Sequence, residues 1–221
     1  TAVFAIQQLA KAKARPNFGN AGEVNNLLSK AIRVMQIRRS TELLKEDFAS
    51  PQPTGSVDDI FSDLVGCDRV VSKLREYQST IKRAQSKGQN PREFIEYNFI
   101  FAGSPGTGKT TVARRMGKMF NLLGLLPFDE VIDISASDLI TGYVGQAGQK
   151  TRELFTRASG RVLFIDEAYQ LNPQQGGGYM QEVADEIVKC LTSEEFRGKL
   201  LVILAGYEGD MDKMLHVNAG L

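Results

Sequence analysis

Cysteine and histidine are scarce in this sequence, whose 221 residues include two cysteines and one histidine. Cys67 and Cys190 stand far apart, without C-x-x-C spacing and without a histidine-rich neighbour. A disulfide framework and a cysteine–histidine metal site are therefore excluded as organising features. We expect both thiols to be reduced, which indicates an intracellular protein of the cytoplasm, with a reducing organelle as the alternative.

A surplus of one charge and long apolar runs are missing as well. The 27 basic and 26 acidic residues give a formal net charge of +1 at pH 7. No global field therefore draws the chain to nucleic acid or to an anionic membrane. No apolar segment approaches the length of a transmembrane span. We expect neither a nucleic-acid partner nor a membrane partner.

The sequence does contain a glycine-rich turn that satisfies G-x-x-x-x-G-K-[ST], the segment GSPGTGKT at 103–110. Glycines let backbone N–H groups surround a phosphate at the N-terminus of the following helix. We expect Lys109 to reach the β- and γ-phosphates of ATP and the Thr110 hydroxyl to hold Mg²⁺. The predicted nucleotide contacts in this loop are Ser104, Pro105, Gly106, Thr107, Gly108, Lys109, Thr110 and Thr111.

The flanks of this turn decide between a phosphate-binding loop and a chance glycine turn. Phe99 to Ala102 has the pattern of a buried strand, and apolar residues recur at helical spacing after the turn. Strand, loop and helix in this order form the context that the motif requires. The sequence therefore predicts a nucleotide-binding loop.

A second apolar run, Val162 to Ile165, ends in Asp166 and Glu167. We expect Asp166 to hold the Mg²⁺ shell through water at the end of this strand. Glu167 is the expected catalytic residue, because a carboxylate can orient and deprotonate the water that attacks the γ-phosphate. An adjacent glutamate favours hydrolysis over transfer to a bound acceptor.

Apolar strands alternate with amphipathic helices along most of the chain, which predicts an α/β fold whose parallel sheet is covered on both faces. The expected strands are 99–102, 131–134, 162–165 and 200–205. Residues 1–45 read as a helical segment, whose second helix reaches about Leu44. Residues 46–57 are rich in proline, serine and glycine and read as a linker. The main domain would then occupy 58–221.

GSPGTGKTTVARRMG together with VLFIDEAYQL resembles the AAA+ ATPases, in the group of the red-type Rubisco activase (CbbX) and stage V sporulation protein K. The resemblance covers about 58–221 and implies a P-loop NTPase core of parallel sheet sandwiched by helices. It also implies the cofactors ATP and Mg²⁺, a hexameric ring of identical or related AAA+ modules, and a client polypeptide. By the same resemblance, Leu64, Val65 and Gly66 would border the adenine.

Tyr143, Val144 and Gly145 match the aromatic–hydrophobic–glycine pore loop with which this family grips a client. An aromatic between glycines on a polar loop is easily exposed, and exposed aromatics favour contact roles. A tyrosine packed on its own loop is the alternative. Residues 174–179, QQGGGY, stand where a second pore loop would be. A flexible loop without that role is an equally good interpretation of this sequence.

The first segment, RPNFGNAGEVNNLLSKAI, resembles the end of the family's helical lid. Because it precedes the core, and because Thr1 is not a natural start, we expect a fragment of a tandem-module protein. Gly22 stands where the family carries a nucleotide-sensing arginine. The arginines that reach a neighbour's nucleotide, the last core strand and the second lid would follow Leu221, so we expect weak or no hydrolysis by the isolated chain.

The first hypothesis is an ATP-driven protein remodeller that works as part of a ring and threads a client polypeptide. Two alternatives to it stay open. One is a nucleotide-controlled assembly or scaffold module that hydrolyses little ATP, which the glycine at 22 and the missing arginines favour. The other is a nucleic-acid-dependent ATPase of the same superfamily, which lacks the expected basic patch and interleaved aromatics.

Overall fold

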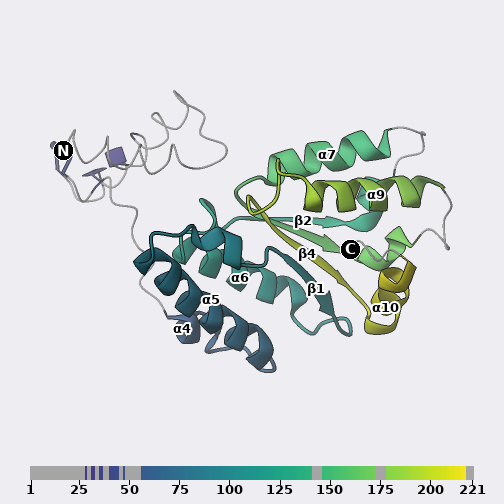
Figure 1. Cartoon of the computed structure of the whole chain (residues 1–221), viewed down its shortest axis with the longest axis horizontal. Helices are drawn as coiled ribbons and strands as arrows, with labels where there is room; N and C mark the ends of the chain where they lie inside the picture. The colour runs from purple at the N-terminus through teal and green to yellow at the C-terminus, as the bar shows by residue number, and fades with distance from the viewer. Residues whose placement is uncertain are drawn as a thin grey trace. The chain divides into compact units, whose positions relative to one another are not determined.

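The computed structural model describes residues 56–140, 146–172 and 178–217, together with 28, 31, 32, 35, 36, 40–44 and 47. The chain divides into two compact units, Thr1–Thr54 and Gly55–Leu221 (Figure 1).

The helix of the first unit is shorter than the sequence predicts. Residues 28, 31, 32, 35 and 36 are helical, and Ala31 is fully buried. Residues 40–44 are not helical, so the expected extension to Leu44 is wrong. The Ser40 hydroxyl accepts a hydrogen bond from the Glu42 backbone N–H at 3.2 Å, a local bond that competes with helix formation.

The second unit begins with a short helix, α4 (Val57–Phe61), that the sequence analysis missed. Ser56 caps it, because its hydroxyl accepts from the Asp59 N–H while the Asp59 carboxylate accepts from the Ser56 N–H. Val57 and Phe61 are buried. Residues 56 and 57, predicted as the end of the linker, therefore belong to the folded unit.

Four parallel strands form the sheet of the second unit, in the order β1-β4-β3-β2. This result confirms the predicted parallel sheet, and each strand lies within one residue of its predicted bounds. The strands are β1 (Asn98–Ala102), β2 (Val131–Ser135), β3 (Val162–Asp166) and β4 (Leu201–Gly206).

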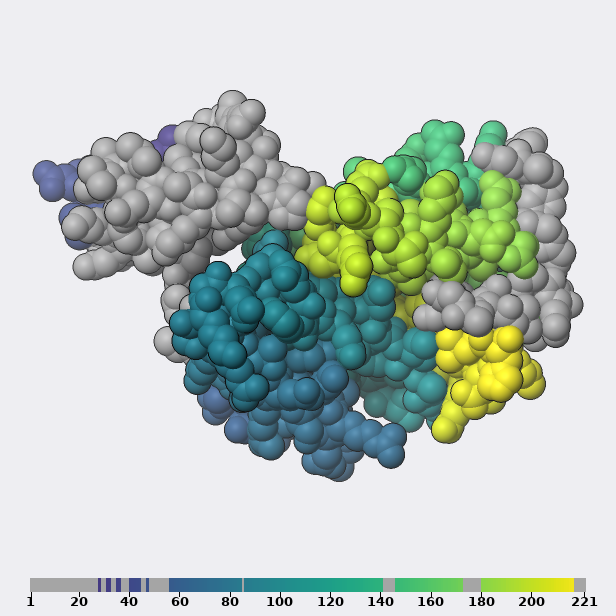
Figure 2. All heavy atoms as spheres, in the orientation of Figure 1, coloured from purple at the N-terminus to yellow at the C-terminus, as the bar shows by residue number. Residues whose placement is uncertain are grey.

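Helices cover both faces of this sheet, as Figure 1 shows. One face packs against α4, α5 (Asp68–Ser86) and α6 (Lys109–Leu122), and the other against α7 (Ala147–Ala158), α9 (Gly178–Thr192) and α10 (Glu208–Val217). Short 3₁₀ helices are η1 (Pro91–Phe94), η2 (Ala136–Leu139) and η3 (Ala168–Leu171). In the face shown in Figure 2, side chains from the helices hide most of the sheet. Among the described helices, none combines the length and apolarity needed to cross a bilayer.

The two hydrophobic cores explain why the central strands are apolar throughout. Val162 and Phe164 of β3 belong to the core under α6, whereas Leu163 and Ile165 belong to the core under α7 and α9. All four side chains are fully buried. Successive residues of a strand point to opposite faces, so a strand covered on both faces needs an unbroken apolar run.

The topology brings three segments to one edge of the sheet. The glycine-rich loop follows β1, Asp166 ends β3, and Tyr207 follows β4. Because the strands are parallel, their carboxyl ends meet at the same edge, which is where open α/β sheets bind ligands. β4 lies between β1 and β3, so the residues after β4 lie between the loop and Asp166.

Gly117 of α6 provides a test of this packing. An added Cβ would lie 2.9 Å from both the Asp129 carbonyl oxygen and the Val162 Cγ2 atom, neither of which can easily move. Gly117→Ala is expected to lower the free energy of unfolding by about 1–3 kcal/mol, despite the higher helix propensity of alanine. Urea denaturation measures the change. Gly209→Ala in α10 is the control, because nothing lies within 4 Å of its Cβ position. Equal changes in both variants would contradict the packing argument.

Candidate functional site

The glycine-rich loop owes its shape to two glycines in the left-handed region. Gly106 has φ 74° and Gly108 has φ 83°, values at which an L side chain is strained. Nothing lies within 4 Å of the Cβ position of either residue, so backbone conformation rather than crowding requires glycine there. The Thr107 hydroxyl donates to the Ser104 carbonyl at 2.8 Å and closes the loop on itself.

Lys109 and Thr110 open α6 directly after this loop. Gly108 is the N-cap of α6 and provides no side-chain cap. The N–H groups of the first turn and the positive end of the helix dipole therefore suit a bound anion. The Lys109 ammonium donates to the carbonyls of Gly103 at 3.0 Å and Ser104 at 2.9 Å, which holds it at the loop.

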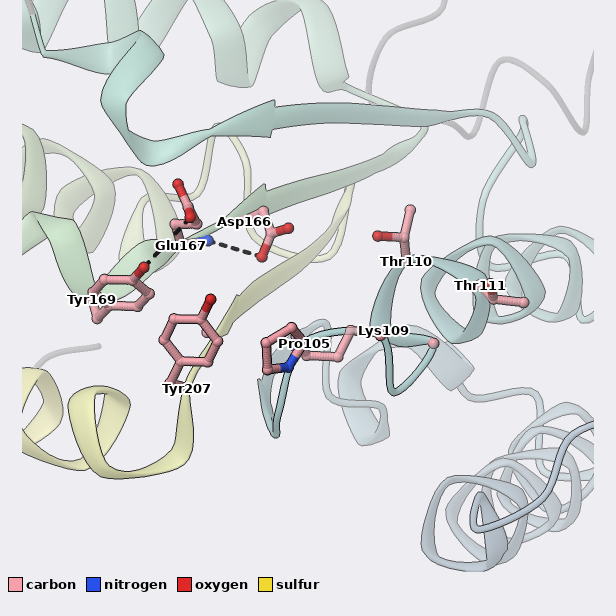
Figure 3. Close-up of a pocket in the computed structure, with 11 residues that line it drawn as sticks. Pro105, Lys109, Thr110, Thr111, Asp166, Glu167, Tyr169 and Tyr207 are labelled. Atoms are coloured by element: carbon pink, nitrogen blue, oxygen red, sulfur yellow. Dashed lines mark hydrogen bonds between the residues drawn. The ribbon is translucent and has the colours of Figure 1, made fainter.

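The loop faces a pocket of about 360 Å³ at the carboxyl edge of the sheet. This volume lies within the usual range of small-molecule sites, about 300–1,000 Å³. Figure 3 shows the pocket residues converging from α6, β3, η3 and β4. The lining residues are Pro105, Gly106, Gly108, Lys109, Thr110, Thr111, Asp166, Glu167, Tyr169, Gly206 and Tyr207.

Asp166 and Glu167 both line this pocket although they are neighbours in sequence. Glu167 has φ 53°, the one positive φ among the described residues other than glycine. A left-handed backbone of this kind costs on the order of 1–3 kcal/mol and occurs most often at functional sites. The Asp166 carboxylate accepts the Glu167 backbone N–H at 2.9 Å. The structure thus brings together the two carboxylates and the loop that the sequence analysis predicted.

The oxygens of Thr110 and Asp166 are suitable ligands for Mg²⁺. They lie on facing sides of the pocket in Figure 3. Mg²⁺ prefers oxygen ligands and is usually bound by one or two protein groups, with waters and substrate phosphates completing its shell. A hydroxyl and a carboxylate beside a phosphate-binding loop provide that donor set.

Three side chains donate hydrogen bonds to the Glu167 carboxylate. Gln170 Nε2 lies 2.8 Å from Oε2, Ser135 Oγ lies 3.4 Å from Oε2, and the Tyr169 hydroxyl lies 3.4 Å from Oε1. None of these three side chains was predicted to join the site. The only signal that could have indicated Gln170 is its position three residues after Glu167, and this spacing brings the side chains together only if a turn follows.

Tyr169 and Tyr207 form a stacked pair at the pocket wall, with ring centroids 5.3 Å apart and ring planes at 28°. Gly206 makes room for this pair, because an added Cβ would lie 2.9 Å from Tyr169 Cδ1 and 2.7 Å from Met211 Sδ. The ring of Tyr207 thus supports that of Tyr169.

Two pKa shifts accompany the site. Burial, the Glu167 charge and Tyr207 raise the pKa of Tyr169 above its ordinary value, so its hydroxyl stays protonated and donates at neutral pH. Burial raises the pKa of Asp133 on β2; Arg114 opposes this shift and Asp166 reinforces it. Asp133 and Asp166 are thus close enough for the charge of one to affect the other.

Some predicted site residues do not join this pocket. Leu64, Val65 and Gly66, expected at the adenine, are not among the described residues that line it, and the Val65 side chain is 99% exposed. Ser104 and Thr107 shape the loop from within rather than line the pocket. The predicted pore loop at 143–145 lies outside the described residues, as do Gly22 and most of the possible second pore loop.

Comparison with known protein families agrees with this arrangement. Residues 99–217 match the ATPase family associated with various cellular activities (AAA), and residues 1–54 match an AAA lid domain. The first match contains the loop, both carboxylates and the tyrosine pair. The second supports the expected lid-like first segment.

Individual relatives point to the same group. Stage V sporulation protein K of Bacillus subtilis (strain 168) is 32% identical over 212 residues, covering 92% of this chain and 65% of that protein. The chloroplastic ribulose bisphosphate carboxylase/oxygenase activase of Cyanidioschyzon merolae is 33% identical over 190 residues, covering 85% and 64%. Protein CbbX of Cereibacter sphaeroides is 35% identical over 167 residues, covering 74% and 53%.

The chain thus spans less than two thirds of the length of each of these three relatives. The matched part nevertheless includes more than half of this chain and the whole of the described pocket. The chain belongs to the ATPase family associated with various cellular activities (AAA), in the group that includes protein CbbX and stage V sporulation protein K.

Proposed function

We propose that this chain is the ATP-binding and ATP-hydrolysing module of a ring-forming protein remodeller. The observation that carries the proposal is that the loop before α6, Asp166 and Glu167 line the same pocket. The reaction is hydrolysis of ATP to ADP and phosphate. Each part of the pocket has a chemical role in it.

The loop and Lys109 would bind the phosphates. Lys109 has three N–H donors, and two of them bond to the carbonyls of Gly103 and Ser104. The third remains for a β- or γ-phosphate oxygen. Because the carbonyl bonds hold the ammonium at the loop, little side-chain entropy is lost when the phosphate binds.

Thr110 and Asp166 would hold Mg²⁺, which when bound neutralises the charge that develops on the phosphate oxygens. Glu167 would accept a proton from the attacking water. Positioning and electrostatic stabilisation provide most of the rate enhancement in phosphoryl transfer, so the rigidity of these groups matters as much as their identity.

The proposed ring and client rest on the family and on the predicted pore loop. One relative is named an activase of ribulose bisphosphate carboxylase/oxygenase, which is a protein that acts on another protein. By analogy, Tyr143 would contact a client polypeptide. The client, the ring and the role of Tyr143 belong to the proposal.

Removing the Lys109 ammonium tests nucleotide binding. Lys109→Ala is expected to weaken binding of a fluorescent ATP analogue with Mg²⁺ by about 10- to 100-fold, the range expected for one bond between charged groups. Fluorescence titration measures the dissociation constant. Lys118→Ala, an exposed lysine on the same helix, is the control and should bind like the parent. Unchanged binding in Lys109→Ala would rule out a phosphate contact for this residue.

Changing the expected base tests hydrolysis. Glu167→Gln should bind the ATP analogue like the parent but hydrolyse ATP about 10²- to 10⁴-fold more slowly, because an amide cannot accept the proton. Phosphate release is measured with the full-length protein, since weak or no hydrolysis is expected of the isolated chain. The protein is in excess over ATP, so that a single turnover reveals slow rates. Glu194→Gln, an exposed position, is the control. A parent that binds ATP and never hydrolyses it would favour the scaffold alternative.

Tyr143 tests the client proposal. Tyr143→Ala should reduce binding of fluorescein-labelled unfolded casein, with ATPγS present, by about tenfold or more, as expected for an aromatic anchor. Tyr143→Phe keeps the ring and should bind like the parent. Fluorescence anisotropy follows the binding. Equal casein binding by all three proteins would remove Tyr143 from client contact.

A further inference from the structure

The Glu167 carboxylate is held unequally at its two oxygens. Oε2 receives two hydrogen bonds, from Gln170 Nε2 at 2.8 Å and from Ser135 Oγ at 3.4 Å. Among the described residues, the Tyr169 hydroxyl alone donates to Oε1, at 3.4 Å. An ionised carboxylate has about four acceptor sites, two on each oxygen. Both sites of Oε2 are therefore used, whereas Oε1 keeps one site for another donor.

Gln170 makes the shortest of these three bonds. The contacts from Ser135 and Tyr169 lie at the long limit for a hydrogen bond, and the Ser135 hydroxyl also lies 2.9 Å from the Ser137 hydroxyl. An amide donor at 2.8 Å from a carboxylate is a charge-assisted bond of good length. Gln170 therefore sets the orientation of the carboxylate more strongly than the other two residues.

The backbone makes Gln170 a rigid support for Glu167. Glu167 is the N-cap of η3, and the Gln170 backbone N–H donates to the Glu167 carbonyl at 2.9 Å. Ala168 and Leu171 of the same turn are fully buried in the core. The side chain of Gln170 thus bonds to Glu167 from a turn that the buried side chains of Ala168 and Leu171 hold in place. Neither group has to be ordered anew when substrate binds.

We propose that Gln170 is a positioning residue for ATP hydrolysis, and this proposal rests on the proposed function. Its amide N–H holds Oε2 of Glu167, so that Oε1 offers its remaining acceptor site to the attacking water. An O–H bond of that water breaks and its proton passes to Oε1, while the water oxygen bonds to the γ-phosphorus and the bond to ADP breaks. Glu167 then returns the proton to the products or to solvent. Gln170 itself neither gains nor loses a proton.

Gln170→Met tests this role, because methionine matches the length of glutamine and has no donor. In the full-length protein, the single-turnover rate constant at saturating protein should fall by about 10- to 100-fold. The dissociation constant for the fluorescent ATP analogue should stay within about twofold of the parent. A residue that only supports the fold would change binding together with the rate. Gln170→Glu keeps the length but places a second carboxylate beside Glu167, and should be at least as slow as Gln170→Met.

Gln149→Met is the matched control. Gln149 Nε2 donates to Glu153 Oε1 at 2.8 Å on the exposed face of α7, which is the same bond at the same length away from the pocket. This variant should bind and hydrolyse ATP like the parent. A slower Gln149→Met would show that loss of any such bond affects the rate, and would overturn the proposal.

The remaining outcomes separate this proposal from the function on which it rests. If the parent hydrolyses ATP and Gln170→Met is equally fast, the positioning role is wrong and the proposed function stands. If Gln170→Met hydrolyses ATP faster than the parent, the Gln170 bond keeps the Glu167 carboxylate in a less active orientation. This result would also overturn the proposal. Parallel loss of binding and rate would indicate a structural role instead. A parent no faster than Glu167→Gln would refute the proposed hydrolysis, and the positioning role with it.

Discussion

Parallel pairing of β4 between β1 and β3 is the constraint on which the site depends. The register aligns Ala102 with Gly206 and Ile165 with Leu204, so that the three strands end together. The Gly103 N–H continues the pairing by donating to the Gly206 carbonyl at 3.1 Å. The glycine-rich loop is therefore attached to the sheet at the point where Asp166 and Glu167 emerge. A shift of one residue in either pairing would separate the loop from Asp166.

Burial of the sheet on both faces stabilises a site that is itself strained. The core strands β3 and β4 contribute an unbroken set of buried apolar side chains, and η3 adds Ala168 and Leu171. A residue with positive φ such as Glu167 persists only where its surroundings over-determine it. The buried residues of η3, which directly follows β3, and the two hydrogen bonds between Gln170 and Glu167 hold Glu167 in this conformation.

The sequence predicted the elements whose signals are local and strong. The apolar strands and the glycine–lysine loop need no tertiary information, because run length and motif spacing define them. The capped helix α4 was missed because five residues are too few to show a periodic pattern. Gln170 and Tyr169 were missed for another reason. Their contacts to Glu167 depend on a left-handed residue followed by a 3₁₀ turn, and no pattern of residue types indicates that combination.

The left-handed conformation of Glu167 also explains how adjacent residues serve different roles in one pocket. In an extended strand, successive side chains point to opposite faces of the sheet, so Asp166 and Glu167 could not both line this pocket. The positive φ ends the strand at Asp166 and turns the Glu167 side chain to the same pocket. Different partners then distinguish the two groups. Asp166 accepts the Glu167 N–H and faces Thr110, which suits its proposed role as a metal ligand. Side-chain donors hold Oε2 of Glu167, which suits its proposed role as a base through Oε1.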